Sequence, residues 1–233
     1  MDTIDFEPPR PSPALDAAEY QVSRQFAQYI RIIKNIQQTV LMYGKLKKKT
    51  NDWALDTSFV NHNKDYPLWL QELPEDMQII YPDDGSPPWI PSHYVANMHT
   101  YHYLGVIMHL RPQLHAVSES YDGTWKQHML SCYSAAKNMC RLQEAIIKTY
   151  GLPGLLCMQR GISFTIYAVL TCTMLHLVST PLVGSQNIID RNRLQLRAQI
   201  PILMTTLESS LSDTCGFWRS VLLFGPCRKC RSK

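Results

Sequence analysis

The N-terminal residues lack the charged-then-apolar pattern of a signal peptide, and the sequence lacks both a disulfide-like cysteine framework and strand-like alternation. These three absences argue against a secreted, disulfide-rich or all-β protein. Its seven cysteines are an odd set scattered through apolar sequence, and its N-terminus is acidic. We therefore expect free thiols in a reducing intracellular setting. No segment alternates apolar and polar residues between hairpin turns, whereas several repeat apolar residues every three or four positions. The sequence predicts an all-α multi-helix bundle.

A strong excess of charge of one sign is also missing. The 23 Lys and Arg residues exceed the 19 acids by four, and the last seven residues contain four bases, Arg228, Lys229, Arg231 and Lys233. Without these four, residues 1–226 carry 19 bases and 19 acids and are formally neutral. A domain that binds DNA phosphates needs a persistent basic face. Composition therefore argues against a freestanding DNA-binding domain.

Composition changes along the chain predict three parts. Residues 1–19 are an acidic, proline-rich flexible arm, residues 20–212 are an α-helical domain, and residues 213–233 are a basic tail. The domain opens on a helix with no acid between Tyr20 and Asn51, and Gly44 is expected to cap its C-terminus. Its predicted core stripe contains Phe26, Ile30, Ile33 and Val40, with Tyr29, Ile32, Ile36 and Tyr43 beside it.

A proline-rich acidic loop follows. Residues 52–84 carry eight acids and one lysine, and they should form short helical pieces and loops. Ser92 is expected to cap the N-terminus of a central helix from His93 to Arg111, which should stop or kink at Pro112. Further helices are predicted over 124–149, 153–179 and 186–212.

The candidate chemistry does not form a reaction centre. His99, His102 and His109 share one helix face, but His99 and His109 lie about 15 Å apart along the axis, so one metal ion cannot bind both. We expect these histidines to be structural or partner-binding. The acids of the loop should form a solvated face, Glu72, Glu75, Asp76, Asp83 and Asp84.

Recognised enzyme motifs are missing from the sequence, so no enzyme activity is expected. We assign no catalytic, cofactor or metal-binding residue. Cys227 and Cys230 form the one C-x₂-C pair, but three residues after it cannot complete a zinc site, so a frayed basic tail is favoured. Lys45–Lys49 could serve as a nuclear-import patch or simply as a solvated helix end.

Two alternatives from other classes stay open. Residues 161–179 lack Asp, Glu, Lys and Arg, so a small membrane-associated protein spanning there is the main alternative to a buried core helix. Recovery in the membrane fraction after a carbonate wash would favour the span. The second alternative is a helical enzyme with a buried pocket near His99, His102 and Tyr103. Such a site requires an acidic side chain that faces those histidines.

One stretch resembles a known family. Leu68-Trp-Leu-Gln-Glu-Leu-Pro74, Asp84-Gly-Ser-Pro-Pro-Trp-Ile-Pro-Ser-His93 and the helix from His99 through Tyr101-His102 to Leu110-Arg111-Pro112 are similar to the fungal-specific transcription factor domain. This is the regulatory middle homology region of zinc-cluster transcription factors. Cys132-Tyr-Ser-Ala-Ala136 resembles the next helix of that domain, and the likeness, nearest to cutinase-activator-type regulators, covers about residues 20–212.

The resemblance implies an all-α regulatory domain that controls RNA polymerase II genes in the nucleus. Its partners would be coregulators, its own DNA-binding half, a second copy or a small-molecule inducer, and it would need no membrane. In the family, DNA is read by an N-terminal cluster of six cysteines that holds two zinc ions. No such cluster precedes residue 20, so no zinc ligand is carried over and DNA would be contacted only through a domain missing from this chain. Arg111 is expected to form a buried pair with an acid.

The neutral body generates a first prediction. Residues 1–226 should show no measurable salt-sensitive binding to duplex DNA, because binding by counterion release requires excess positive charge. Mobility-shift titrations at low and at physiological salt would measure it. Tight, sequence-specific binding by this piece would contradict the expectation.

Overall fold

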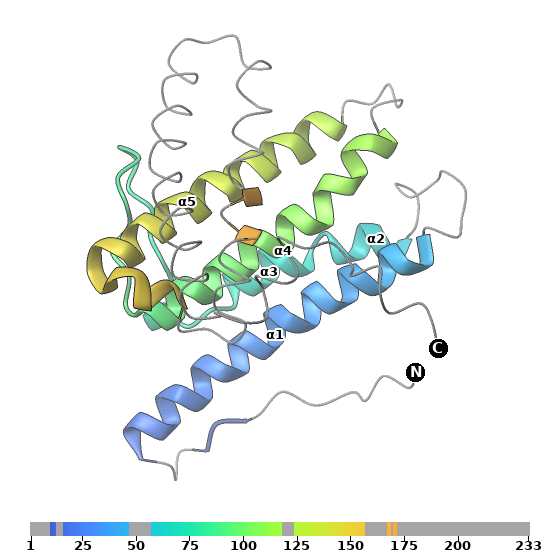
Figure 1. The fold of residues 1–233 in the computed structure, drawn as a ribbon. Helices are drawn as coiled ribbons and strands as arrows, with labels where there is room; N and C mark the ends of the chain where they lie inside the picture. The colour runs from blue at the N-terminus through green and yellow to red at the C-terminus, as the bar shows by residue number, and fades with distance from the viewer. Residues whose placement is uncertain are drawn as a thin grey trace, which may run out of the picture.

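The computed structural model describes residues 10–12, 16–46, 57–117, 124–156, 167–168 and 170–171. In these ranges the regular structure is helical and no strand occurs. The elements are, in chain order, α1 (Ala17–Leu46), α2 (Thr57–His62), α3 (Asp65–Gln71), the 3₁₀ turn η2 (Glu75–Met77), α4 (His93–Val117) and α5 (Thr124–Leu156) (Figure 1). The predicted all-α fold is confirmed for the described residues.

Helix α4 lies at the centre of the described fold. Every residue from Val95 to Gly105 is buried, so this helix is covered on all sides for three turns. Its N-terminus is capped as expected, because Ser92 Oγ accepts the Val95 backbone N–H at 3.1 Å.

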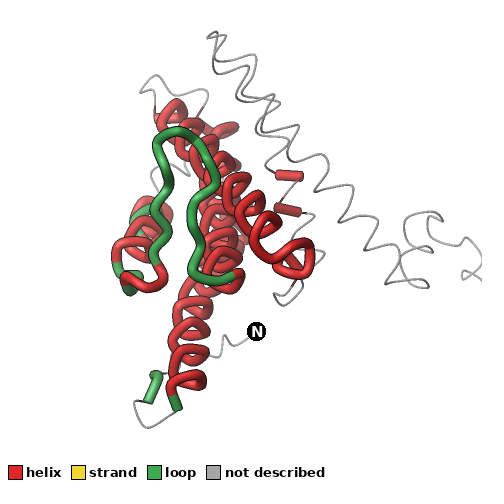
Figure 2. The backbone as a smooth tube through the Cα atoms, turned by 90° about the vertical axis from the view of Figure 1, so that its left-hand side faces the viewer, coloured by secondary structure: helices red, strands yellow, loops and turns green. Residues whose placement is uncertain are grey.

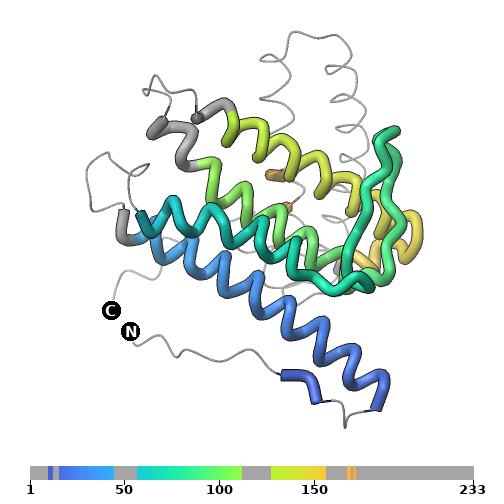
Figure 3. Tube along the Cα trace, turned by 180° about the vertical axis from the view of Figure 1, so that it is seen from behind, coloured from blue at the N-terminus to red at the C-terminus, as the bar shows by residue number. Residues whose placement is uncertain are grey.

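Helix α5 packs along α4 as an antiparallel partner (Figures 1 and 3). Side chains of both helices form one core cluster, which includes Leu104, Ile107, Met139, Leu142 and Ile146. At the far end of the pair, Asn97 Nδ2 donates to the backbone carbonyl of Gly154 at 2.8 Å and fixes the register. The backbone of α5 leaves helical geometry at Gly151, where φ is +67°, a value that glycine adopts without strain.

Helix α1 packs on the other side of α4, but through a different stripe from the one expected. Ile32 is fully buried, and Tyr29, Ile33 and Ile36 pack on the same cluster. Phe26 and Val40, placed in the core stripe by their spacing, are 47% and 54% exposed. The spacing of apolar residues was compatible with burial of either predicted stripe, the one that contains Phe26 and Val40 or the one that contains Ile32 and Ile36. The position of α3 decided which of the two became buried.

The bases of α1 face the acids that follow α3. Arg24 donates two hydrogen bonds to the Asp76 carboxylate, at 2.9 and 3.0 Å, and Arg31 pairs with Glu72. These acids were expected to form a solvated face. They are about half exposed, but each is paired with a base of α1, so two segments of opposite charge are joined.

Several helix ends differ from the predicted ones. α1 begins at Ala17, inside the predicted arm, because the Asp16 carboxylate caps the Glu19 backbone N–H at 2.8 Å. It continues through Gly44 to Leu46, so Gly44 is not a cap. α4 does not stop at Pro112 but runs as α-helix to Val117.

Other sequence predictions fall partly or wholly outside the described residues. The predicted helix over 186–212, the tail with Cys227 and Cys230, and Lys47–Lys49 all lie there. Of residues 161–179 the structure describes four, and among them Ala168 is fully buried in the α4–α5 cluster. No described helix is both long and apolar enough to cross a membrane. The described cysteines, Cys132 and Cys140, are buried thiols outside any disulfide bond, in agreement with the prediction of reduced cysteines.

Glycines 44 and 105 provide a matched test of this packing. A Cβ at Gly105 would lie 2.6 Å from the buried Tyr66 ring and 3.0 Å from Ile36, so Gly105→Ala should destabilise the fold by about 1–3 kcal/mol. At Gly44 nothing lies within 4 Å, so Gly44→Ala should stabilise it by up to about 1 kcal/mol through helix propensity. Urea unfolding followed by circular dichroism measures both; equal effects of the two variants would contradict the close approach of α4 to α3.

Candidate functional site

The most unusual feature of the described fold is a row of stacked rings between α4 and the α2–α3 pair. On α2 and α3, aromatic or imidazole rings recur at spacings of three, four and three residues, which places them on one side: Phe59, His62, Tyr66 and Trp69. All four are buried. We call these rings, together with those of His99, His102 and His109 on α4, the ring ladder.

The rings of the two segments alternate along the ladder. Trp69 lies between His99, at 5.5 Å between ring centroids, and His102, on which it stacks at 5.1 Å. Tyr66 lies between His102 at 5.9 Å and His109 at 5.8 Å. Such contacts are favourable when apolar ring faces are desolvated together. The histidines of α4 are therefore packing residues of this interface.

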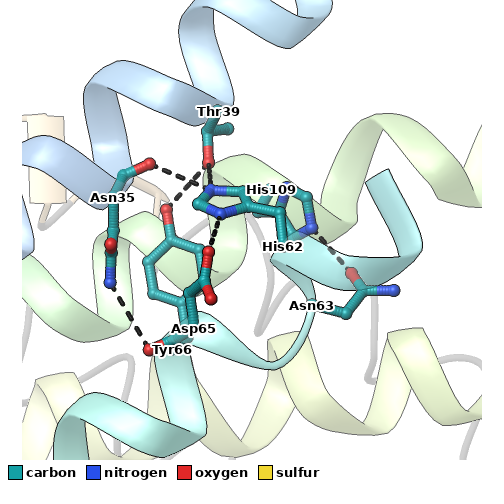
Figure 4. A network of polar contacts seen from close by, with 7 residues as sticks. All are labelled: Asn35, Thr39, His62, Asn63, Asp65, Tyr66 and His109. Atoms are coloured by element: carbon teal, nitrogen blue, oxygen red, sulfur yellow. Dashed lines mark hydrogen bonds and ion pairs between the residues drawn. The ribbon is translucent and has the colours of Figure 1, made fainter. Parts of the chain in front are cut away.

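A buried polar network connects the ladder to α1 (Figure 4). Thr39 Oγ1 lies 3.0 Å from His62 Nε2 and 2.9 Å from the Tyr66 hydroxyl. His62 Nδ1 lies 2.6 Å from the Asp65 carboxylate, and Nε2 is also 3.0 Å from the Asn35 carbonyl. Beside it, His109 Nε2 makes a separate contact with the Asn63 side-chain oxygen at 2.6 Å.

The order Asp65, His62, Thr39 resembles an acid–base–hydroxyl relay, but its environment favours a structural role. The relay would require Nε2 to accept the Thr39 hydroxyl hydrogen, but Nε2 also lies 3.0 Å from the Asn35 carbonyl oxygen, which can only accept a hydrogen bond. Thr39 is 1% exposed, so no substrate carbonyl can approach its oxygen in this conformation. The network satisfies buried polar atoms where α1, α2 and α3 meet.

Burial keeps the three ladder histidines of α4 uncharged. Desolvation lowers the pKa of His99 to about 4 and those of His102 and His109 to about 3. The backbone carbonyl of Met77, 2.9 Å from His99 Nε2, opposes this shift for His99, whereas the neighbouring His62 and His128 reinforce it for His109. Burial also raises the pKa of Tyr66 to about 12. Neutral rings are therefore the folded form at physiological pH.

The pocket hypothesis around His99, His102 and Tyr103 required an acid facing the histidines. In the described part of the chain, no hydrogen bond or ion pair joins His99 or His102 to a carboxylate. The histidine that does meet an acid is His62, which the sequence analysis did not single out. Among the described residues, no three His, Cys, Asp or Glu side chains are grouped to hold a metal ion.

The buried arginine is also a different one from that expected. Arg111 is exposed, so its assignment to a buried pair is wrong. Arg141 on α5 is 6% exposed and donates to the backbone carbonyls of Pro82, at 2.6 Å, and Ser86, at 2.6 and 2.9 Å. Its partners are loop carbonyls, which carry no sequence signal, and for that reason residue type alone could not identify it. For His62, the ring spacing from Phe59 to Trp69 was an available signal.

The chain matches no family model, no curated protein and no solved structure. The likeness to the fungal transcription factor domain therefore stays a prediction.

The ladder predicts marked acid sensitivity. The pKa of each of the three histidines is lower in the folded chain than the ordinary 6.5, so the unfolded chain takes up more protons as pH falls below 6.5 and stability is lost. Between pH 7 and 5.5 each should cost about 1 kcal/mol, or about 3–4 kcal/mol together. Urea unfolding at the two pH values measures this loss.

His102→Phe is the matched control. Phenylalanine keeps a ring against Trp69, and it removes a buried Nδ1 that has no hydrogen-bond partner among the described residues. The variant should remain within about 1 kcal/mol of the parent at pH 7. It should reduce the acid loss by about a third, since one of three titrating rings is gone. An unchanged acid loss in this variant would refute the assignment.

Proposed function

We propose that the chain is a regulatory and interaction domain of a fungal RNA polymerase II transcription factor. It acts in the nucleus, and the zinc-cluster half that reads DNA is absent from this chain. It has no catalytic role and needs no resident cofactor. Its partners are proteins, namely coregulators, its own DNA-binding half or a second copy, and a small inducer between helices is compatible with the same role.

The observation that supports this proposal is that the segments carrying the resemblance pack against one another. Trp69, from the Leu68–Pro74 motif, contacts His99 and His102 of the second motif. Leu73 and Tyr101 belong to the same core cluster. Residues of the Cys132–Ala136 motif pack on the opposite side of α4. Motifs distant in the sequence thus pack against two sides of the same helix, α4, as expected if they belong to a single domain.

The charges of the described core also favour a role in binding. The bases of α1 that face α3 are paired with acids of the same chain, so they do not form a free cationic surface for phosphates. The ladder histidines of α4 are neutral and buried, which suits packing rather than proton transfer. A domain with this charge distribution would act through contacts between proteins.

Recruitment to a promoter tests the role directly. The full chain, fused to an unrelated DNA-binding domain, should change transcript levels of a reporter by at least about threefold in a fungal host, as expected for about 0.7 kcal/mol of recruitment free energy. Gly44→Ala should keep this effect, whereas Gly105→Leu, which overfills the core, should abolish it. A folded, nuclear fusion that leaves the transcript unchanged would refute the proposal.

Sequencing the transcript upstream of Met1 tests the family assignment separately. An in-frame cluster of six cysteines would support it. A stop codon directly upstream would leave a regulator without its own DNA reader and would contradict the division into two halves.

A further inference from the structure

The loop between η2 and α4 is held as a rigid projection. Residues 78–92 form two arms that run side by side (Figures 2 and 3), joined by a turn in which the Gly85 N–H donates to the Pro82 carbonyl at 3.4 Å. Gly85 has a φ of +83°, which the turn requires and other residues rarely adopt. Four prolines restrict the arms further, Pro82, Pro87, Pro88 and Pro91.

The inner side of this loop is anchored in the core. Ile79 and Tyr81 of the first arm and Ile90 of the second pack in the α4–α5 cluster. Arg141 lies below, with its guanidinium 5.1 Å from the Tyr81 ring and bonded to the Pro82 and Ser86 carbonyls. The loop is therefore fixed by apolar contacts and by a buried cation at once.

The outer side presents two large apolar side chains to solvent. Ile80 is 85% exposed and Trp89 is 78% exposed, although the residues on either side of each face inward. Isolated surface leucines need no explanation, but an almost fully exposed tryptophan on a preordered loop is a common anchor of protein interfaces. Little conformational entropy is lost when such a loop is bound, because it is already ordered.

The charge of the loop identifies the kind of partner. Its charged residues are Asp83 and Asp84, both exposed at the tip, and it contains no Lys or Arg. Asp84 accepts the Ser86 backbone N–H at 2.8 Å, which lowers its pKa and keeps it ionised at neutral pH. The positive charge of Arg141 is buried beneath the loop, so the charge that the tip exposes is negative.

We propose that the outer face of residues 78–92 is a docking site for a basic protein segment with interspersed apolar side chains. An arginine of the partner lies on the Trp89 ring, where a cation is attracted to the π face. An apolar side chain covers Ile80, and further bases pair with Asp83 and Asp84. This docking site does not depend on the transcriptional role, because the loop alone defines the face. Peptide binding can therefore be measured without any promoter.

The test uses the full chain and a fluorescein-labelled hexapeptide of sequence LRRLRR, with binding measured by fluorescence anisotropy. The peptide should bind, and Trp89→Ala should weaken binding by at least about tenfold, as for an interface anchor. Replacing both aspartates, Asp83→Asn with Asp84→Asn, should weaken it by about threefold or more and flatten its salt dependence. The peptide LEELEE should not bind.

Leu130→Ala is the matched control, because Leu130 is 65% exposed but lies on α5. It should leave binding unchanged, and all variants should keep the parent melting temperature, since each altered side chain is exposed. Absence of binding, or equal weakening by Leu130→Ala and Trp89→Ala, would overturn the proposal. So would sedimentation evidence that Trp89 joins two copies of the chain while the peptide fails to bind.

Discussion

Desolvation of neutral imidazole rings is the constraint on which the described fold depends. The histidines of α4 pack between Phe59, Tyr66 and Trp69 as uncharged rings, because burial of a cation there would cost its hydration. The ladder thus joins α4 to α2–α3 and makes that contact conditional on pH. The Thr39–His62–Tyr66 network performs the complementary task, since it gives polar atoms partners where α1 meets the same rings.

Two kinds of interaction position the other elements around the ring ladder: close backbone packing and the pairing of charged side chains. Gly105 lets the Tyr66 ring lie directly against the backbone of α4, which a side chain would prevent. The ion pairs from Arg24 and Arg31 hold α1 over the segment that follows α3. Arg141 holds the loop before α4, on the opposite side of the same helix. The outer face of the 78–92 loop stays exposed, so a partner protein can bind there.

The resemblance to the fungal regulatory domain rests on residues that the structure places mostly in the core. Trp69, Leu73, Tyr101, His102 and Cys132 are all buried. Core residues of this kind specify how helices pack, and the same packing can support different functions. The likeness therefore bears most directly on architecture. The function of an interaction domain depends on its surface. The reporter assay and the peptide-binding measurement at the exposed loop both test that surface.

Local patterns in the sequence determined the helical class and the Ser92 cap, because both depend on neighbours within one turn or on helical period. Tertiary structure alone decided which stripe of α1 is buried, that Arg141 rather than Arg111 is enclosed, and that Asp65 meets His62. Period defines the faces of a helix, but a face becomes core only when another element covers it. An acid or a backbone carbonyl likewise becomes a hydrogen-bond partner only where the fold brings it next to the donor. The spacing of residues along the sequence does not determine that contact.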